Sequence, residues 1–209
     1  MKKTTLFCIF ALVLSSCGIF RKTETQQVQD PATFDERVVI NGVRWATRNV
    51  DMPGTFTETP EDRGMLFQWN RKTALWSVYD ERIEDRRNFF PVATEWYAEN
   101  DPCPTGWRVP TDTEFRSLMN AGGEWTTQND VNGLLFGTAP YQIFLPATDI
   151  SAIAGNVRVE GKYAIYWSNK QYTCPRTDHG TAAVVMSSRT GMSVFWQENA
   201  LLVRCVAKN

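Results

Sequence analysis

The chain has 209 residues, of which 43% are hydrophobic and 22% are charged, and its formal net charge is -1. This length and composition suit one globular domain with a single substantial core. A charge so close to zero, without a long basic stripe, excludes the electrostatic footprint with which proteins collect nucleic-acid phosphates. Nucleic acid is therefore not an expected partner.

The first sixteen residues have the pattern of a secretory leader. Lys2 and Lys3 precede the apolar run Leu6–Leu14, which is too short to span a bilayer as a stable helix. Leu-Ser-Ser then precedes Cys17, an order that resembles the lipobox of bacterial lipoproteins, in which the cysteine becomes the acylated first residue of the mature chain. We expect residues 1–16 to be a signal peptide, and acyl chains such as palmitate on Cys17 to hold the protein to a membrane.

Residues 17–36 are mostly polar and cannot bury enough surface to order themselves, so we expect a flexible tether there. The globular domain is expected to span residues 37–209. It begins with short apolar runs on either side of Asn41-Gly42, the residue pair that a two-residue type I′ turn favours. This pattern predicts a β-hairpin.

Two segments follow that the sequence describes less sharply. The run Met65–Trp69 fits a strand or another buried segment, and periodicity cannot decide between them over so few residues. The charge cluster in residues 72–88 is typical of a solvated helix or loop face.

The sequence of residues 100–115, NDPCPTGWRVPTDTEF, predicts the start of a helix. Thr111 and Glu114 have the spacing of a capping box, in which each side chain satisfies the other residue's backbone N–H. Phe115 and Leu118 then begin an apolar stripe that includes Met119, and the glycines at 122 and 123 follow where a helix would end. We expect one amphipathic helix of about three turns here.

The rest of the chain alternates short apolar segments with glycines and polar turn residues, and Ser187–Gly191 is expected to join two antiparallel strands. Without alternation of strands and helices, the predicted class is α+β, with antiparallel sheets and one or two short helices. The predicted strands are YQIFLPA, YAIYWSN, TAAVVMS, SVFWQ and LLVRCVA.

Several segments, taken in order, resemble the Fibrobacter succinogenes major paralogous domain family; they are INGVRWATRNV, GMLFQW, NDPCPTGWRVPTDTEF, YWSN and the closing VRCV. The Cys-Pro-x-Gly-Trp-Arg-x-Pro-Thr core at Cys103–Thr111 is the most specific of them. The resemblance covers residues 37–209 and implies a divergent C-type-lectin-like fold, the broad architecture that formylglycine-generating enzymes also use. Members of the family are typically secreted proteins and lipoproteins of Bacteroidetes and related bacteria.

Besides Cys17, the expected mature chain keeps three cysteines, which an oxidising compartment would convert into one disulfide and one thiol. The resemblance implies a Cys103–Cys205 bond that ties the entry of the helix to the last strand. Closing a loop of about 100 residues is worth roughly 4 to 5 kcal/mol in the chain-entropy model. Cys174 would then be the free thiol, and Cys174–Cys205 is the alternative pairing.

Candidate catalytic and metal-binding groups are few. His179 is the single histidine and lies in a polar segment beside Asp178, which favours an ordinary solvent-facing loop over a nucleophile's base. The stretch Asn129–Gly133 carries side-chain oxygens that calcium could use, but the full EF-hand pattern is absent and an Asx-rich turn is favoured. We expect no catalytic residue, no metal and no cofactor.

Eight tryptophans raise the question of an aromatic ligand platform. Three of them, Trp76, Trp96 and Trp125, lie in loop-like surroundings and are the ligand-binding candidates. Arg108 is expected to be a buried scaffold residue that bonds loop carbonyls. The indoles within apolar segments are expected in the core, where such large rings dominate burial; these are Trp45, Trp69, Trp107, Trp167 and Trp196.

These features predict a non-catalytic module of the bacterial cell envelope, lipid-anchored to the outer membrane, with a protein or glycan partner. Whether it faces the periplasm or the cell surface is left open. One alternative is a carbohydrate-binding or adhesin-like surface protein. Another is an oxidoreductase of the formylglycine-generating type, which would need a reactive cysteine pair near the C-terminal half; Cys174 and Cys205 are the nominal candidates, without a matching local motif.

Overall fold

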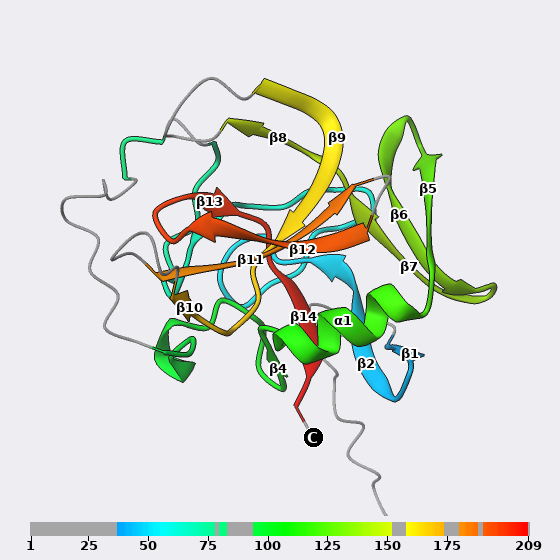
Figure 1. Cartoon of the computed structure of the whole chain (residues 1–209), viewed down its shortest axis with the longest axis horizontal. Helices are drawn as coiled ribbons and strands as arrows, with labels where there is room; N and C mark the ends of the chain where they lie inside the picture. Colours follow the sequence, from blue (N-terminus) through cyan, green and yellow to red (C-terminus); the bar gives the residue numbers. More distant parts are fainter. Residues whose placement is uncertain are drawn as a thin grey trace, which may run out of the picture.

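The computed structural model describes residues 37–77, 80–82, 94–151, 158–173, 180–187 and 190–208. Its α+β class, with mostly antiparallel sheets and one α-helix among the described residues, is the one predicted (Figure 1). In chain order the elements are β1 (Val38–Ile40), β2 (Val43–Asn49), β3 (Phe67–Gln68), the 3-10 turn η2 (Ala98–Asn100), β4 (Trp107–Arg108), α1 (Asp112–Asn120), β5 (Gly123–Gln128), β6 (Val131–Thr138), β7 (Tyr141–Pro146), β8 (Thr148–Ser151), β9 (Arg158–Tyr166), β10 (Tyr172–Thr173), β11 (Gly180–Ser187), β12 (Thr190–Trp196), β13 (Ala200–Leu201) and β14 (Arg204–Ala207).

A four-stranded sheet, ordered β1-β2-β14-β4, joins the beginning and the end of the described chain. Its first hairpin is the predicted one. Asn41 and Gly42 both have positive φ, 49° and 80°, and Ile40 pairs directly with Val43. The positive φ at both turn positions is what a type I′ turn requires. This prediction is confirmed.

Alternation along the last strand divides the interior into two cores. Val206 packs with Trp45 and Phe115 in one hydrophobic cluster, whereas Cys205 and Ala207 pack in a second cluster. Successive strand residues point to opposite faces of a sheet, so β14 supplies both clusters from one short segment. The four-stranded sheet is therefore the wall between the helix side and the loop side of the molecule.

Helix α1 forms as its sequence predicts. Thr111 accepts the Glu114 N–H, and the Glu114 side chain accepts the Thr111 N–H, which completes the capping box. Phe115 and Leu118 are fully buried, so the apolar stripe faces the core. After the helix, Gly122 has a φ of +78°, a conformation that glycine adopts without strain.

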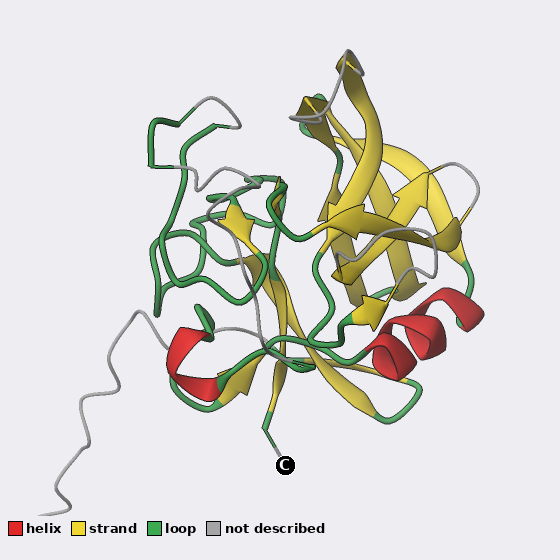
Figure 2. Cartoon of the chain, turned by 60° about the vertical axis from the view of Figure 1, so that its left-hand side comes forward, coloured by secondary structure: helices red, strands yellow, loops and turns green. Residues whose placement is uncertain are grey.

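The helix side is completed by the three-stranded sheet β5-β6-β7 (Figure 2). Its first hairpin turns at Asn129 and Asp130, both at positive φ, so the Asx-rich segment is a tight turn as favoured. Sequence analysis did not anticipate β5, whose residues GEWTTQ include no strong apolar run. The strand forms because Trp125 and its neighbours pair with β6 along the whole length of β5.

The remaining strands form two further sheets. β11 pairs antiparallel with β12, with Met186 opposite Thr190, which confirms the predicted connection at Ser187–Gly191. β11 also pairs with β9 and β10, and β9 with β8. In the Met65–Trp69 run, only Phe67–Gln68 is a strand, paired with β13. The described part of residues 72–88 is loop.

Candidate functional site

The centre of the candidate site is the signature loop, Asp101–Thr111, which the sequence singled out. Asp101 organises it: one carboxylate oxygen accepts the Cys103 N–H at 2.9 Å, and the other accepts the Val109 N–H at 3.1 Å. Burial raises the pKa of Asp101, and these two donors, with the charges of Lys208 and Arg108, only partly oppose that shift. The carboxylate therefore ties the two ends of the loop together.

The same loop is joined to the last strand in two ways. Cys103 forms a disulfide with Cys205, with the two Cα atoms 6.1 Å apart and 102 residues between them in sequence. This is the pairing that the family resemblance implies. Trp107 pairs with Ala207 in the sheet, and the Lys208 N–H donates to the Gly106 carbonyl at 2.9 Å. The loop is thus bonded covalently and by backbone hydrogen bonds to β14.

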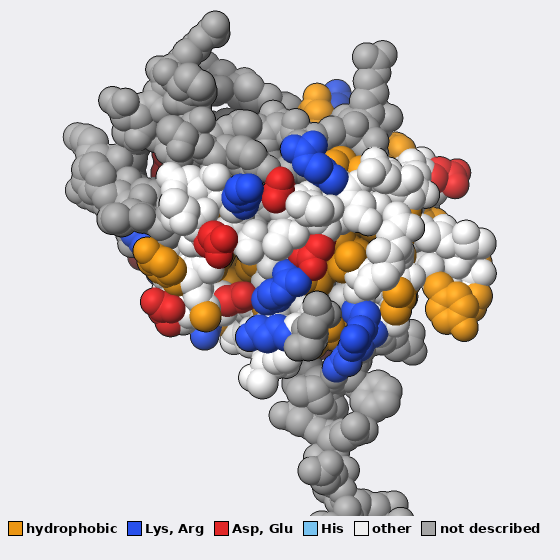
Figure 3. Space-filling model, turned by 60° about the horizontal axis from the view of Figure 1, so that its bottom comes forward, with side chains coloured by type: hydrophobic (Ala, Val, Ile, Leu, Met, Phe, Trp, Pro, Cys, Tyr) orange, Lys and Arg blue, Asp and Glu red, His pale blue; other side chains and the backbone are white. Residues whose placement is uncertain are grey.

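Arg108 contributes a side-chain tie to the helix. Its two terminal nitrogens donate to the two oxygens of Glu114 at 2.8 and 2.6 Å. Burial alone would raise the pKa of Glu114, but the Arg108 guanidinium and the Thr111 donors outweigh it and lower that pKa. Arg108 also donates to the Val109 carbonyl at 3.3 Å, so it does bond a loop carbonyl, but it is half-buried rather than buried and its shorter contacts are those with Glu114. Charged side chains of both signs surround this end of the molecule (Figure 3).

Cations and aromatic rings alternate beside the loop. The guanidinium of Arg37 lies 5.4 Å from the centre of the Trp107 ring, and the Phe56 ring meets Trp107 edge-on at 5.4 Å. Arg48 in turn lies 5.9 Å from the Phe56 ring centre. Such cation–aromatic contacts are favourable and hold arginine side chains in place. The first described residue, Arg37, is thereby fixed over the signature loop.

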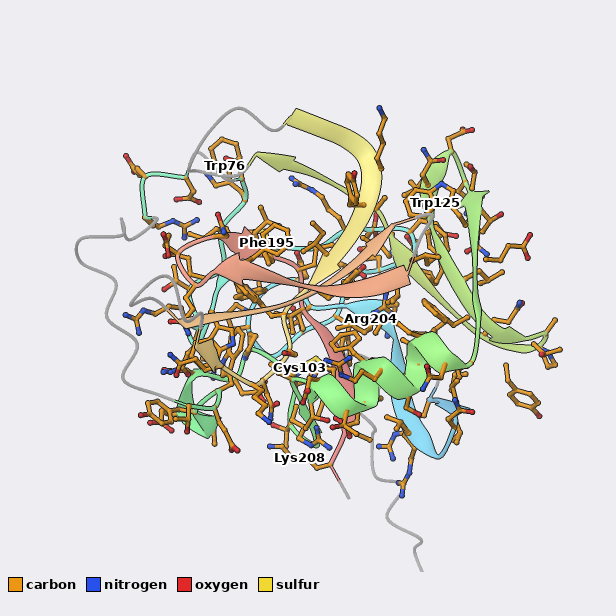
Figure 4. The ribbon with its side chains drawn as sticks, viewed as in Figure 1. Trp76, Cys103, Trp125, Phe195, Arg204 and Lys208 are labelled. Atoms are coloured by element: carbon orange, nitrogen blue, oxygen red, sulfur yellow. A yellow bond between two sulfur atoms is a disulfide. The ribbon has the colours of Figure 1, made fainter. Side chains whose placement is uncertain are left out.

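The three candidate tryptophans are not brought together. Figure 4 shows Trp76 and Trp125 on opposite sides of β9. Trp76 is 62% exposed, whereas Trp125 on β5 is half-buried and packs against the helix-side core. The expectation that Trp96 is available to a ligand is not met. Trp96 is only 8% exposed and packs edge-on against Trp69, with ring centres 5.8 Å apart. Among the described residues, these three rings form no common ligand platform.

The exposed Trp76 indole stands on a backbone that is held from both sides. The Trp76 N–H donates to Asp80 at 3.3 Å, and the Trp76 carbonyl accepts from Arg63 at 3.0 Å. Asp80 also receives the Arg82 side chain, and the hydrogen bonds from Arg82 lower the pKa of Asp80 below its usual range. We call residues 74–77 and 80–82 the Trp76 loop. These hydrogen bonds hold the backbone that carries its solvent-exposed indole.

Buried indoles connect the loops behind this surface. Trp69 donates its ring N–H to the Ser168 carbonyl at 3.0 Å, and Trp167 donates to the Phe67 carbonyl at 2.6 Å. Asn70 accepts the Tyr97 N–H at 2.8 Å and so ties η2 to the same group. Four of the five tryptophans expected in the core are buried, namely Trp45, Trp69, Trp107 and Trp167, and the side chain of the fifth, Trp196, lies outside what is described.

A buried polar network was not anticipated from the sequence. Arg204 is fully buried and donates to Asn49 at 2.9 Å, to the Ala46 carbonyl at 2.9 Å and to the Phe144 carbonyl at 2.8 Å. Asn49 also donates to the Tyr166 hydroxyl at 3.1 Å, and burial raises the pKa of Tyr166 to about 12. The sequence does contain one indication of this network. Arg204 lies among apolar residues in LLVRCVA, and strand alternation places it on the same face as the buried Val206.

Other predicted residues lie elsewhere. Cys17, Cys174 and His179 are outside the described residues. In the Asx-rich turn, Asn132 accepts from Thr127 at 2.7 Å, and Asn129 donates to Glu61 at 2.9 Å. Across the described ranges, no three His, Cys, Asp or Glu side chains are grouped so that they could hold a metal ion.

Comparison of the chain with protein-family models, with curated proteins and with solved structures finds no match. Within the part of the chain that the structure describes, no helix has the length and apolar character needed to cross a membrane.

Proposed function

We propose that this protein is a non-catalytic interaction module of the bacterial envelope, belonging to the Fibrobacter succinogenes major paralogous domain family. Lipid on Cys17 holds it to the outer membrane, and a C-type-lectin-like domain presents loops to a protein or glycan partner. The leader and lipobox in the sequence support the anchor, and the five family-like segments support the fold.

The commitment of the signature loop to internal bonds carries this proposal. Cys103 is in a disulfide, Asp101 accepts from two backbone N–H groups, and Arg108 is paired with Glu114. A reactive site keeps a nucleophile, acid or base free to meet a substrate. The side chains that make this loop distinctive instead hold it in shape, which supports the role of a scaffold.

Trp76 is the feature that favours a binding role over a purely structural one. A large exposed ring on a fixed backbone provides contact area with little loss of conformational freedom on binding, and such aromatic anchors dominate many interfaces. The same indole could stack on a sugar ring, which is the observation that favours the carbohydrate-binding or adhesin-like alternative. Both versions place the partner at the Trp76 loop.

The oxidoreductase alternative receives less support. It needs Cys174 and Cys205 as a pair, and Cys205 is bonded to Cys103 in this structure. Copper titration of the reduced protein tests it directly, because a cysteine-dependent site would bind the metal and lose that binding when Cys174 is replaced by serine.

Partner capture from intact cells tests the main proposal. The chain is crosslinked in its native envelope, and in parallel it is applied to a glycan array in calcium and in EDTA. We expect Trp76→Ala to weaken partner or glycan binding by about 30-fold, the loss typical of an interface hot spot of 2 kcal/mol. Tyr141→Ala removes an aromatic residue that is 70% exposed on the β6–β7 hairpin and serves as the matched control.

Two results would contradict the proposal. The first is a turnover assay in which activity depends on His179 or Cys174. The second is partner binding that Trp76→Ala and Tyr141→Ala weaken equally. Protease shaving of intact cells adds the orientation, because cleavage of the domain places it at the cell surface and protection places it in the periplasm.

A further inference from the structure

Three cations come together at one end of the molecule only through folding. Arg37 precedes β1, Arg44 lies on β2, and Lys208 follows β14. Figures 1 and 2 both place the β1–β2 hairpin, β4 and the C-terminal end at the same end of the domain. Figure 3, which views that end, shows several Lys and Arg side chains there, with Asp and Glu side chains among them. We call Arg37, Arg44 and Lys208 the basic face.

Contacts within the domain hold these residues near one another. The Arg37 guanidinium lies over the Trp107 ring, and Lys208 is bonded through its N–H to Gly106, the residue just before that tryptophan. Val39, which is 58% exposed, pairs in register with Arg44 and follows Arg37 by two residues. Val39 therefore lies directly beside Arg44 in the first hairpin, next to the start of β1 that Arg37 precedes.

The charges of this face are not neutralised by the ion pairs of the described residues. Arg108 and Arg116, which come from the neighbouring strand and helix, are paired with Glu114 and Asp112. Arg37, Arg44 and Lys208 are exposed, and no ion pair joins them to another described residue. The carboxylate whose pKa responds to Lys208 is Asp101, which is partly buried and occupied by two N–H donors.

We infer that the basic face lies against anionic lipid headgroups. The inference rests on the proposed lipid attachment at Cys17. Nineteen residues, 18–36, separate Cys17 from Arg37. A polar tether of that length has a mean reach of about 25 Å, so the end of the domain that carries Arg37 stays close to the leaflet that holds the lipid. Phosphate headgroups of an anionic leaflet complement three cations that have no ion pair with another described residue, one of which lies beside an exposed apolar side chain.

This orientation has a consequence for the partner. Figure 4 places Lys208 at one end of the molecule and Trp76 at the other. With the basic face on the headgroups, the Trp76 loop points away from the membrane. The anchored domain then presents its exposed indole toward whatever lies above the leaflet.

The test uses the full lipid-modified chain reconstituted in vesicles of phosphatidylcholine alone or of phosphatidylcholine and phosphatidylglycerol in equal parts. Flotation reports anchoring by Cys17. Acetylation of lysine side chains by a water-soluble reagent, quantified by mass spectrometry, reports the orientation. We expect Lys208 to react about tenfold more slowly in the anionic vesicles and to regain its reactivity in high salt, because screening weakens surface charge contacts. Lys72 is exposed in the loop that follows β3 and should react equally in both vesicles.

Two charge variants test whether the cations of the basic face, and not charge elsewhere on the domain, cause the docking. Arg37→Gln with Arg44→Gln should lower the docking constant on anionic vesicles by about 30-fold, since each cation near such a surface contributes about fivefold. Lys162→Gln with Lys170→Gln removes the same charge from other elements and should leave the Lys208 protection unchanged.

The outcomes distinguish failure of headgroup binding by the basic face from failure of lipid attachment at Cys17. Flotation with equal Lys208 reactivity in the two vesicle types overturns the inference and leaves the anchor intact. Protection of Lys208 that is as strong on neutral vesicles also overturns it, because charge would then not be the cause. Absence of flotation from all vesicles overturns the lipid attachment and this inference with it.

Discussion

Two loops of this protein are each organised by an aspartate, and they use it in opposite ways. In the signature loop, Asp101 accepts two backbone N–H groups eight and two residues ahead, and burial raises its pKa. In the Trp76 loop, Asp80 is paired with Arg82, and those hydrogen bonds lower its pKa. The first loop is also bonded through a disulfide to the last strand, whereas the second holds up an exposed indole.

The difference shows that one loop of this small domain maintains the fold and another is available for binding. The signature loop is tied to the sheet and the helix, so its residues set the positions of the elements around it. The Trp76 loop is fixed locally, through Asp80 and Arg63, and its ring remains available to a partner. Substitutions in the first loop should therefore change stability, and substitutions in the second should change binding.

The largest stability effect is expected from the disulfide. Replacing Cys103 and Cys205 together by serine should lower the free energy of unfolding by about 4 to 5 kcal/mol, less any strain that the bond carries, because it closes a loop of about 100 residues. Urea unfolding of the variant and the parent, both without reductant, measures this. Cys174→Ser is the control and should change stability by less than about 1 kcal/mol. A small effect of the double variant would show that the bond does not hold the loop to the sheet.

Asp101→Asn is expected to have the next largest effect. The amide keeps one oxygen but replaces the other with a donor, so either Cys103 or Val109 loses the acceptor for its N–H. Leaving a buried donor unpaired costs about 1 to 3 kcal/mol. The control is Asp130→Asn, at an exposed turn position where asparagine also tolerates positive φ, and it should stay within about 0.5 kcal/mol. Equal effects of the two variants would contradict the organising role of Asp101.

Glu114→Gln should cost about 1 kcal/mol at neutral pH, because it removes the two-pronged pairing with Arg108 but can retain part of the helix cap. The folded-state pKa of Glu114 is lowered, so its stabilisation is complete above the unfolded value of about 4.3 and is lost as pH falls through the folded value. The gap between parent and variant should thus close on acidification below about pH 4. Glu124→Gln, at an exposed position on β5, is the control for the loss of a carboxylate.

Acid should also separate the two aspartate loops. The lowered pKa of Asp80 means that its contribution is present above about pH 3.9 and is lost as pH falls further. The raised pKa of Asp101 has the opposite sign: burial disfavours its ionised form, so the pH-dependent part of its free energy favours folding most below about pH 3.9 and weakens as pH rises through the folded value, while its oxygens still accept the two N–H groups. Hydrogen exchange below pH 4 should therefore show earlier opening at Trp76 and Arg82 than at Cys103 and Val109. Simultaneous loss of protection in both loops would remove the distinction.

The smallest stability effect is expected from Trp76→Ala. Because 62% of the residue is exposed, its removal should change the free energy of unfolding by less than about 0.5 kcal/mol. Trp96→Ala removes a buried indole and should cost about 3 to 5 kcal/mol in the same assay. A comparable loss from both variants would mean that Trp76 is a packing residue.

Apart from the Cys103–Cys205 bond, which the family resemblance implied, the sequence predicted what depends on neighbouring residues and missed what depends on distant ones. The Asn41-Gly42 hairpin and the Thr111–Glu114 cap were predictable because each is decided within a few residues. The burial of Trp96 was not, since it follows from contact with Trp69, 27 residues earlier in the chain.

The polar groups of the interior show the same limit. The acceptors around Arg204 come from β2 and β7, and only the assembled sheets bring them together. For the candidate site, the sequence indicated that the signature loop is a scaffold, but not that Asp101 closes it or that Arg108 reaches Glu114.

Peptide mapping of the mature protein without reduction tests whether the signature loop is a scaffold bonded to the last strand. After digestion with free thiols blocked, we expect a disulfide-linked pair of peptides that contain Cys103 and Cys205, and a blocked thiol on Cys174. A disulfide between Cys174 and Cys205, or a free thiol on Cys103, would contradict it.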